Sequence, residues 1–302
     1  ASAAAAASGA AAGRGGMYPA LSFPFLDEEY DAFEDKRIID VDPNPTHQSA
    51  LSRSKIFKEY APNVFSWVRT QLYGVSSREY IASMEGDSEN IEEAYASQVR
   101  GFSEAKGGGF FFFSADRKYL IKTMDREEHR TLLRILQPYT EYLLSAEGRH
   151  SLVMRVLGCY SIRMYGVKKY FFVFQNLFDP SVAPSPMHEV YDLKGSWVDR
   201  HVGPPRTASE KRKRARGLHT RKDTDWPASR YLRLSDEKKA TLLRQVQRDA
   251  RFLCRLNIMD YSVLLGIHIV PTPRSECCVG LSRRMDPAKP TESTHFIYLF
   301  KV

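Results

Sequence analysis

The stretch from Lys106 to Thr123, KGGGFFFFSADRKYLIKT, carries the clearest fold signal in the chain. Two apolar runs, Phe110–Ser114 and Tyr119–Thr123, flank the polar turn Ala115–Lys118, which predicts a β-hairpin. The glycines before the first strand would let backbone N–H groups approach a triphosphate, and Lys122 on the second strand could reach its phosphates. A glycine hairpin with a solvated lysine explains the same residues, so the motif alone leaves both interpretations open.

A helix is predicted after this hairpin, over about 126–136, with Asp125 as its N-cap. Glu128 lies three residues after Asp125, which is the spacing of a capping box. In protein kinases a helix glutamate pairs with the strand lysine and fixes it towards the phosphates. Glu128 therefore either caps its own helix or pairs with Lys122, and the spacing does not decide between them.

The remaining pattern predicts an α+β protein with a two-lobed arrangement of antiparallel sheet and helices, and a ligand-binding cleft between the lobes. Apolar residues four apart from Ile56 to Leu72 predict a helix starting near Lys55. A second long helix is predicted over Asp236–Leu256, with Leu243 and Leu253 on its apolar face. Further strands are predicted at Met154–Met164, Tyr170–Gln175, Val190–Leu193, Val263–Ile269 and Phe296–Val302.

Composition bounds the class of protein. No apolar run approaches 18 residues, so no transmembrane helix is expected. The four cysteines form no CxxC pair, which favours a reducing compartment such as the cytoplasm over a disulfide framework. Residues 1–16 are almost entirely Ala, Gly and Ser, so we expect a low-complexity, disordered segment over 1–50 and a folded domain over 51–302.

Positive charge is concentrated in one segment. The chain carries a net charge of +8, and His201–Lys222 holds eight Lys/Arg against one Glu. We expect an exposed basic loop at about 201–222, with a second, polar loop at about 271–293. The basic run could meet an anionic surface or act as a nuclear localisation signal, which would give a nuclear pool. It has no interleaved aromatic residues, so nucleic-acid binding is not expected.

Two further strings carry candidate chemistry. Asp192–Ser196 reads DLKGS, in which Lys194 supplies a cation, Gly195 an unhindered backbone and Ser196 a hydroxyl. Such a strand end suits phosphate binding, although it is also a common strand-to-turn sequence. Asp260 lies between the long helix and a strand, where an aspartate can accept or orient an attacking hydroxyl, or simply form a turn.

Together these strings resemble the signature motifs of phosphatidylinositol phosphate kinases. Five segments occur in the family's order. They are Ile56–Pro62 (like the family's first helix), Leu120–Thr123 (its ATP-lysine strand), Asp192–Ser196, Lys222–Trp226 (the stretch after its basic loop) and Ile258–His268.

The resemblance implies a protein-kinase-like two-lobed fold, ATP with Mg²⁺, and a phosphatidylinositol monophosphate held in an anionic membrane surface. It favours conversion of phosphatidylinositol 4-phosphate to phosphatidylinositol 4,5-bisphosphate by a peripheral enzyme of the plasma membrane, with a homodimer as one oligomeric state. By position, Asp260 would be the catalytic aspartate and Lys194 would lie near the transferred phosphate.

The resemblance also assigns the nucleotide side. Lys122 would be the ATP lysine, facing Asp260 across the cleft, and Glu128 its ion-pair partner. Lys106 and Gly108 would lie in the loop over the phosphates.

One family element is expected and not found in the sequence. The family's Ile-Ile-Asp string, whose Asp holds Mg²⁺, should follow Asp260, but the chain ends at Val302 without it. The string at Ile38–Asp40 precedes the ATP lysine and does not replace it. We therefore expect a chain truncated at its C-terminus, with the metal ligand unknown. The alternative is an inactive, phosphoinositide-binding pseudokinase or scaffold.

Overall fold

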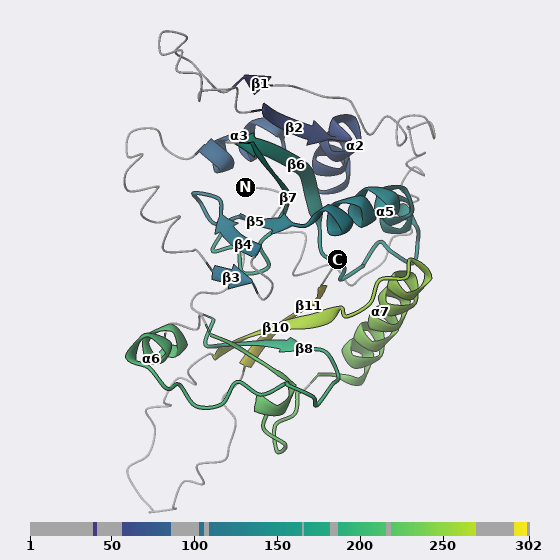
Figure 1. The fold of residues 1–302 in the computed structure, drawn as a ribbon. Helices are drawn as coiled ribbons and strands as arrows, with labels where there is room; N and C mark the ends of the chain where they lie inside the picture. Colours follow the sequence, from purple (N-terminus) through teal and green to yellow (C-terminus); the bar gives the residue numbers. More distant parts are fainter. Residues whose placement is uncertain are drawn as a thin grey trace, which may run out of the picture. The chain divides into compact units, whose positions relative to one another are not determined.

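The computed structural model describes residues 39–40, 56–85, 103–105, 109–164, 166–181, 187–215, 219–232, 234–269 and 293–300 (Figure 1). The expected N-terminal segment 1–50 and polar loop 271–293 lie almost wholly outside these residues. The chain divides into two compact units. The N-terminal unit comprises Ala1–His150 and Arg155–Val182, and the C-terminal unit comprises Ser151–Met154 and Ala183–Val302.

The N-terminal unit is built on a seven-stranded sheet in the order β1-β2-β6-β7-β5-β4-β3. Neighbouring strands in this sheet pair antiparallel. The strands are β1 (Ile39–Asp40), β2 (Ile56–Tyr60), β3 (Ser103–Ala105), β4 (Gly109–Phe113), β5 (Tyr119–Met124), β6 (Val156–Met164) and β7 (Val167–Gln175). The predicted hairpin is confirmed, because Phe111 pairs with Lys122 and Phe113 with Leu120.

The helix predicted from Lys55 is wrong in its first part. Residues Ile56–Tyr60 form β2, which pairs with β6 on one side and β1 on the other. Ala61 then adopts a left-handed conformation (φ 45°), and Pro62 starts the helix α2 (Pro62–Trp67), which continues as the π-helical turn η2 (Val68–Leu72). The missing N–H of a proline costs nothing at the first helical position, so the chain changes from strand to helix there.

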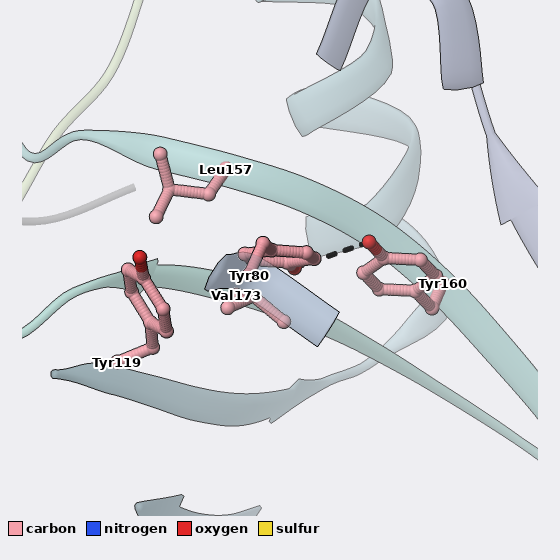
Figure 2. Close-up of a cluster of buried hydrophobic side chains, with 5 residues drawn as sticks. All are labelled: Tyr80, Tyr119, Leu157, Tyr160 and Val173. Carbon is pink, nitrogen blue, oxygen red and sulfur yellow. Dashed lines mark hydrogen bonds between the residues drawn. The ribbon is translucent and has the colours of Figure 1, made fainter. Parts of the chain in front are cut away.

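The helix α3 (Ser77–Glu85) packs on this sheet through a cluster of buried aromatic and aliphatic side chains. Figure 2 shows Tyr80 of α3 beside Tyr119, Leu157, Tyr160 and Val173 of the strands. The hydroxyls of Tyr80 and Tyr160 are 3.1 Å apart and hydrogen-bond to each other. Burial raises the pKa of Tyr160 to about 12, so this hydroxyl stays protonated and the pair adds no buried charge.

The helix α5 (Arg126–Leu144) begins at the predicted N-cap and is longer than predicted. Asp125 accepts hydrogen bonds from the N–H groups of Glu127 and Glu128, as a capping residue should. The helix runs through Pro138, and its last turns bury Tyr139, Tyr142 and Leu143. Burial of these side chains offsets the cost of a proline inside the helix.

The C-terminal unit is built on a four-stranded sheet in the order β11-β10-β8-β9. The strands are β8 (Glu189–Leu193), β9 (Thr220–Arg221), β10 (Ser262–Ile269) and β11 (Ser293–Phe300). β8 and β9 run parallel, and the other pairs are antiparallel. Tyr191, Leu265 and Ile267 form the buried centre of this unit. The predicted α+β class is confirmed, and resemblance to a protein kinase stays a prediction.

The long helix α7 (Asp236–Arg255) has a more polar inner face than predicted. Leu243 is exposed, whereas Gln245 and Asp249 are buried beside Phe252 and Leu253. The carboxylate of Asp249 accepts hydrogen bonds from the Ser151 hydroxyl (2.8 Å), the Leu152 N–H (2.8 Å) and the Gln245 amide (3.0 Å). These hydrogen bonds satisfy the buried carboxylate. Hydrophobic periodicity could not reveal Gln245 and Asp249 as inner-face residues, because it identifies only the apolar positions of a helix.

The basic loop predicted at 201–222 contains regular structure. It includes the helix α6 (Ala208–Ala215) and the strand β9, and the 3-10 turn η4 (Asp223–Asp225) follows it. Glu210 accepts a hydrogen bond from the Thr207 N–H while its own N–H donates to the Thr207 hydroxyl. This capping box starts α6, so the sequence did contain a helix signal at Thr207. Within the described residues, no helix has both the length and the apolar character needed to cross a bilayer.

Candidate functional site

The strand register of the C-terminal unit brings the two candidate strings together. In the antiparallel pair of β8 and β10, Leu193 lies opposite Val263 and Asp192 opposite Leu264. Because the strands are antiparallel, the C-terminal end of β8 and the N-terminal end of β10 lie side by side, and the residues that follow β8 and precede β10 leave the sheet at this shared end. Those residues are Lys194 and the loop ending in Asp260 and Tyr261.

The loop before β10 has a defined geometry because α7 ends in a Schellman motif. The N–H of Ile258 donates to the carbonyl of Leu253, and the N–H of Asn257 donates to the carbonyl of Cys254. Asn257 is in the left-handed conformation (φ 56°) that this motif requires, and Ile258 and Leu253 are buried together. Asp260 is also left-handed (φ 65°), which aspartate tolerates better than most residues.

Lys194 and Asp260 form an ion pair. The Nζ atom of Lys194 lies 2.6 Å from a carboxylate oxygen of Asp260. The Lys194 side chain is 20% exposed and that of Asp260 is 69% exposed, so the pair is fixed on its lysine side and open to solvent on its aspartate side. Asp260 is thus a turn residue that also pairs with Lys194, a contact that the sequence did not predict, and its role toward an attacking hydroxyl stays a prediction.

The pair lies in a pocket of about 790 Å³ within the C-terminal unit. This volume is in the range of small-molecule sites. The ammonium group of Lys194, the exposed carboxylate of Asp260 and the hydroxyl of Ser196 all line this pocket. Such a set of donors and acceptors is suited to binding a phosphate group and an alcohol. The pocket is lined by Lys194, Ser196, Val198, Arg200, Cys254, Asn257, Ile258, Met259, Asp260 and Tyr261.

In the N-terminal unit, Glu128 performs both of the tasks that the sequence left open. Its Oε2 atom accepts a hydrogen bond from the N–H of Asp125 at 2.9 Å, which completes the capping box. Its Oε1 atom lies 3.5 Å from the Nζ atom of Lys122. The Lys122 side chain is 12% exposed and its ammonium group lies over the ring of Phe172, 5.7 Å from the centroid. Lys122 is therefore held on β5 as a partly buried cation.

The remaining predicted site residues have no described geometry. Lys106 and Gly108 lie outside the described residues. Lys122 and Glu128 belong to one unit and Lys194 and Asp260 to the other, so their facing each other stays a prediction. Among the residues that the structure describes, no group of three or more His, Cys, Asp or Glu side chains could hold a metal ion. Asp260 offers one carboxylate, the ligand type that Mg²⁺ prefers.

Sequence reasoning missed Arg200 and Asp223. Arg200 lines the pocket, and Asp223 binds the backbone of Lys194. The sequence signal for Asp223 was indirect. Asp223 lies in Lys222–Trp226, a segment that resembles the family but to which no role was assigned.

Comparison with known proteins supports the family. The model of the Phosphatidylinositol-4-phosphate 5-Kinase family matches residues 93–294, more than half of the chain. The chain therefore belongs to the phosphatidylinositol phosphate kinase family.

Individual relatives carry both 4-kinase and 5-kinase names. The chain is 32% identical over 247 residues to phosphatidylinositol 5-phosphate 4-kinase type-2 beta of Rattus norvegicus, covering 82% of this chain and 54% of that protein. It is 33% identical over 235 residues to phosphatidylinositol 4-phosphate 5-kinase its3 of Schizosaccharomyces pombe, covering 77% and 29%. A probable phosphatidylinositol phosphate kinase of Dictyostelium discoideum is 36% identical over 214 residues, covering 70% and 28%. The chain spans about half the length, or less, of these curated relatives.

Proposed function

We propose that this chain supplies the phosphoryl-transfer residues of a lipid kinase that acts on a phosphatidylinositol monophosphate. The observation that carries the proposal is the 2.6 Å pair of Lys194 and Asp260 in a pocket of the C-terminal unit. The pair joins two strings that are distant in sequence and each resembles a family signature. Membership of the family gives the reaction class, because its members are named as kinases of phosphatidylinositol phosphates.

The two residues of the pair take complementary roles in this reaction. Asp260 accepts the proton of the inositol hydroxyl while the hydroxyl oxygen bonds to the γ-phosphorus of ATP and ADP departs. Its exposed carboxylate is accessible for this step. Lys194, which directly follows the C-terminal end of β8, neutralises charge on the phosphoryl oxygens during transfer.

The nucleotide side of the proposal rests on Lys122. As a partly buried cation paired to Glu128, it is suited to hold the α- and β-phosphates of ATP. Mg²⁺, when bound, would neutralise charge on the phosphates. Asp260 is the one carboxylate among the residues that line the pocket, and because its proposed task is to accept the substrate proton, we assign it no role as a metal ligand. Lys106 and Gly108 are proposed for the loop over the phosphates on the resemblance alone.

The substrate we propose is phosphatidylinositol 4-phosphate, phosphorylated to phosphatidylinositol 4,5-bisphosphate. The relatives do not decide this, since both isomer specificities occur among their names. We further propose that the protein works at the cytoplasmic face of the plasma membrane, where exposed cations at Arg206, Lys211 and Arg212 would meet anionic lipid.

The test uses the full-length protein, ATP, Mg²⁺ and vesicles that contain either phosphatidylinositol 4-phosphate or phosphatidylinositol 5-phosphate. We expect a bisphosphate product with the 4-phosphate, and a loss of at least a hundredfold in kcat for Asp260→Asn and Lys194→Ala. Glu237→Gln is the matched control, because Glu237 is an exposed carboxylate in the first turn of α7. Turnover of the 5-phosphate alone would overturn the isomer proposal, and full activity in Asp260→Asn would overturn the site. Lipid binding without turnover would favour the scaffold alternative.

A further inference from the structure

The turn η4 contacts the backbone on which Lys194 is carried. One carboxylate oxygen of Asp223 (Oδ1) accepts hydrogen bonds from the N–H of Lys194 at 2.9 Å and from the N–H of Gly195 at 2.8 Å. Gly195 is left-handed (φ 71°), so the chain turns sharply at the point that Asp223 holds. The orientation of Lys194 as it leaves β8 is therefore tied to a residue far along the chain.

The second carboxylate oxygen of Asp223 extends this contact into a ring of interactions. Its Oδ2 atom lies 2.6 Å from the Nε atom of Arg200. The NH2 group of Arg200 donates in turn to the carboxylate of Asp192 at 2.7 Å and to the Asp192 carbonyl. Asp192 lies two residues before Lys194 and Gly195 directly follows it, so the ring contacts the backbone on both sides of Lys194.

The ring is charged, and its Asp223 and Arg200 members are largely shielded from water, whereas the Asp192 side chain is 35% exposed. The side chains of Asp223 and Arg200 are 10% and 11% exposed. Burial alone would raise the pKa of Asp223, but the hydrogen bonds from Arg200 and Gly195 and the positive charge of Arg200 outweigh it and hold that pKa below its usual range. Asp223 therefore remains a carboxylate, which accepts stronger hydrogen bonds than a neutral group would.

The other aspartate of the turn has a different task. The carboxylate of Asp225 accepts from the N–H groups of Val202 (3.1 Å) and Lys222 (2.9 Å), and pairs with His201 at 2.9 Å. These residues are the two ends of the basic segment 201–222. Asp225 closes the base of that segment, and its carboxylate bonds to this segment and not to the Lys194 backbone, so it provides a matched control for Asp223.

We propose that Asp223 is a positioning residue of the phosphoryl-transfer site, which sets the place of the Lys194 ammonium beside Asp260 by holding the Lys194–Gly195 turn. The inference rests on the proposed function and assigns a role to a residue that touches neither the substrate nor the reacting atoms. Without Asp223, two backbone N–H groups and the Arg200 guanidinium lose a shared acceptor. The turn is then free to move, and a displacement of about 1 Å at a charged group is enough to slow transfer roughly a hundredfold.

A double-mutant cycle tests whether Asp223 acts through Lys194. In the full-length protein, Asp223→Asn should lower kcat at least tenfold and leave KM for ATP within twofold. Asp223→Asn should have almost no further effect when Lys194 is already Ala, because the group that it positions is gone. Asp225→Asn should leave kcat within twofold, alone or combined with Lys194→Ala. Multiplicative losses for Asp223→Asn and Lys194→Ala would overturn the inference.

Amide hydrogen exchange gives a second measurement that needs no activity. The N–H groups of Lys194 and Gly195 should exchange at least tenfold faster in Asp223→Ala than in the parent, and at the parent's rate in Asp225→Ala. Alanine is used at both positions because an asparagine oxygen could still accept hydrogen bonds from these N–H groups. If Asp223→Ala does not fold, Arg200→Lys replaces it, because it keeps the charge and loses the forked contact. Unchanged exchange would overturn the inference. An inactive parent protein with accelerated exchange in the variant would instead count against the proposed function alone.

Discussion

Lys122 and Glu128 form an ion pair in which only one carboxylate oxygen of Glu128 takes part, at 3.5 Å. The other oxygen accepts a hydrogen bond from the backbone N–H of Asp125 and completes the cap of α5. The lysine is thus fixed to the start of a helix, and the cap fixes the glutamate that holds it. Structural and functional roles of Glu128 can be separated because they use different atoms.

Substitution of Glu128 should separate these roles. Glu128→Gln keeps an oxygen for the Asp125 N–H and removes the charge that pairs with Lys122. We expect its free energy of unfolding to stay within about 0.5 kcal/mol of the parent, since a pair that is 42% exposed on one side contributes little. KM for ATP should rise several-fold, because Lys122 is no longer held.

Glu128→Ala is the comparison for this prediction. It removes both oxygens and should cost about 1 kcal/mol more than Glu128→Gln in denaturant unfolding, through loss of the cap. Equal destabilisation by Gln and Ala, or an unchanged KM for ATP in both, would contradict the division of roles.

Gly195 gives a second prediction, on backbone conformation. Its φ is 71°, and a Cβ atom built there would meet nothing within 4 Å. Gly195→Ala should therefore cost about 1 kcal/mol from backbone strain alone, without a steric clash. Because the strain falls on the turn that carries Lys194, kcat should also fall.

Gly166 is a matched control for that change. It lies between β6 and β7 with φ 78° and equally open space. Gly166→Ala should show a similar loss of stability by thermal unfolding and no loss of kcat beyond twofold. A similar fall in kcat for both variants would show that the effect is general strain and not the Lys194 turn.

Features with a local cause could be predicted from the sequence. The hairpin over β4 and β5 follows from apolar runs around a polar turn, and the cap at Asp125 from a spacing of three residues. The strand Ile56–Tyr60 could not be predicted, because its apolar spacing fits a helix and only pairing with β6 decides otherwise.

In the candidate site, too, local sequence patterns indicate individual residues, whereas the contacts between them depend on the fold. Lys194 and Asp260 could be proposed because they stand in strings with a recognisable chemistry. Their contact depends on the register of β8 against β10, which no local pattern gives. Asp223 and Arg200 were missed for a related reason. Each is an ordinary charged residue in the sequence, and only the fold shows that they meet around the backbone of Lys194.

His129 gives a prediction on pH. It is buried against Tyr60 and Tyr170, with ring centroids 4.4 and 4.2 Å away. Burial, together with the positive charges of Lys168 and Arg130, lowers the pKa of His129 to about 4. The unfolded chain, with a histidine pKa of about 6.5, binds more protons than the folded one between these values, so folding stability falls as the pH drops from about 6.5 to about 4.

The variant His129→Phe should reveal this contribution. Phenylalanine keeps an aromatic ring and cannot be protonated, so between pH 7 and pH 5 the parent should lose about 1 to 2 kcal/mol more stability than the variant. The measurement is urea unfolding at both pH values. His150→Phe, at an exposed position, should lose as much as the parent. Equal pH dependence in the parent and His129→Phe would show that the buried ring does not resist protonation.

The last prediction concerns the basic segment, whose cations are not equivalent. Arg221 pairs with Glu189 at 2.8 Å and donates to the Tyr191 hydroxyl, and Lys222 donates to the Asp199 carbonyl at 2.8 Å. These two charges are used within the fold. Arg206, Lys211 and Arg212 are exposed and form the part of the described segment that can meet an anionic membrane.

Changing those three exposed residues to Ala should weaken binding to phosphatidylserine-containing vesicles about tenfold at physiological salt. Each basic residue near such a surface contributes on the order of 1 kcal/mol, reduced by ionic screening. KM for ATP, measured with a soluble substrate head group, should stay within twofold. The matched control changes Lys238, Lys239 and Arg244 of α7, three exposed cations outside the segment, and should bind vesicles as the parent does. Equal losses in the two triple variants would mean that net charge alone drives binding, and parent-like binding by the first would exclude this segment as the membrane contact.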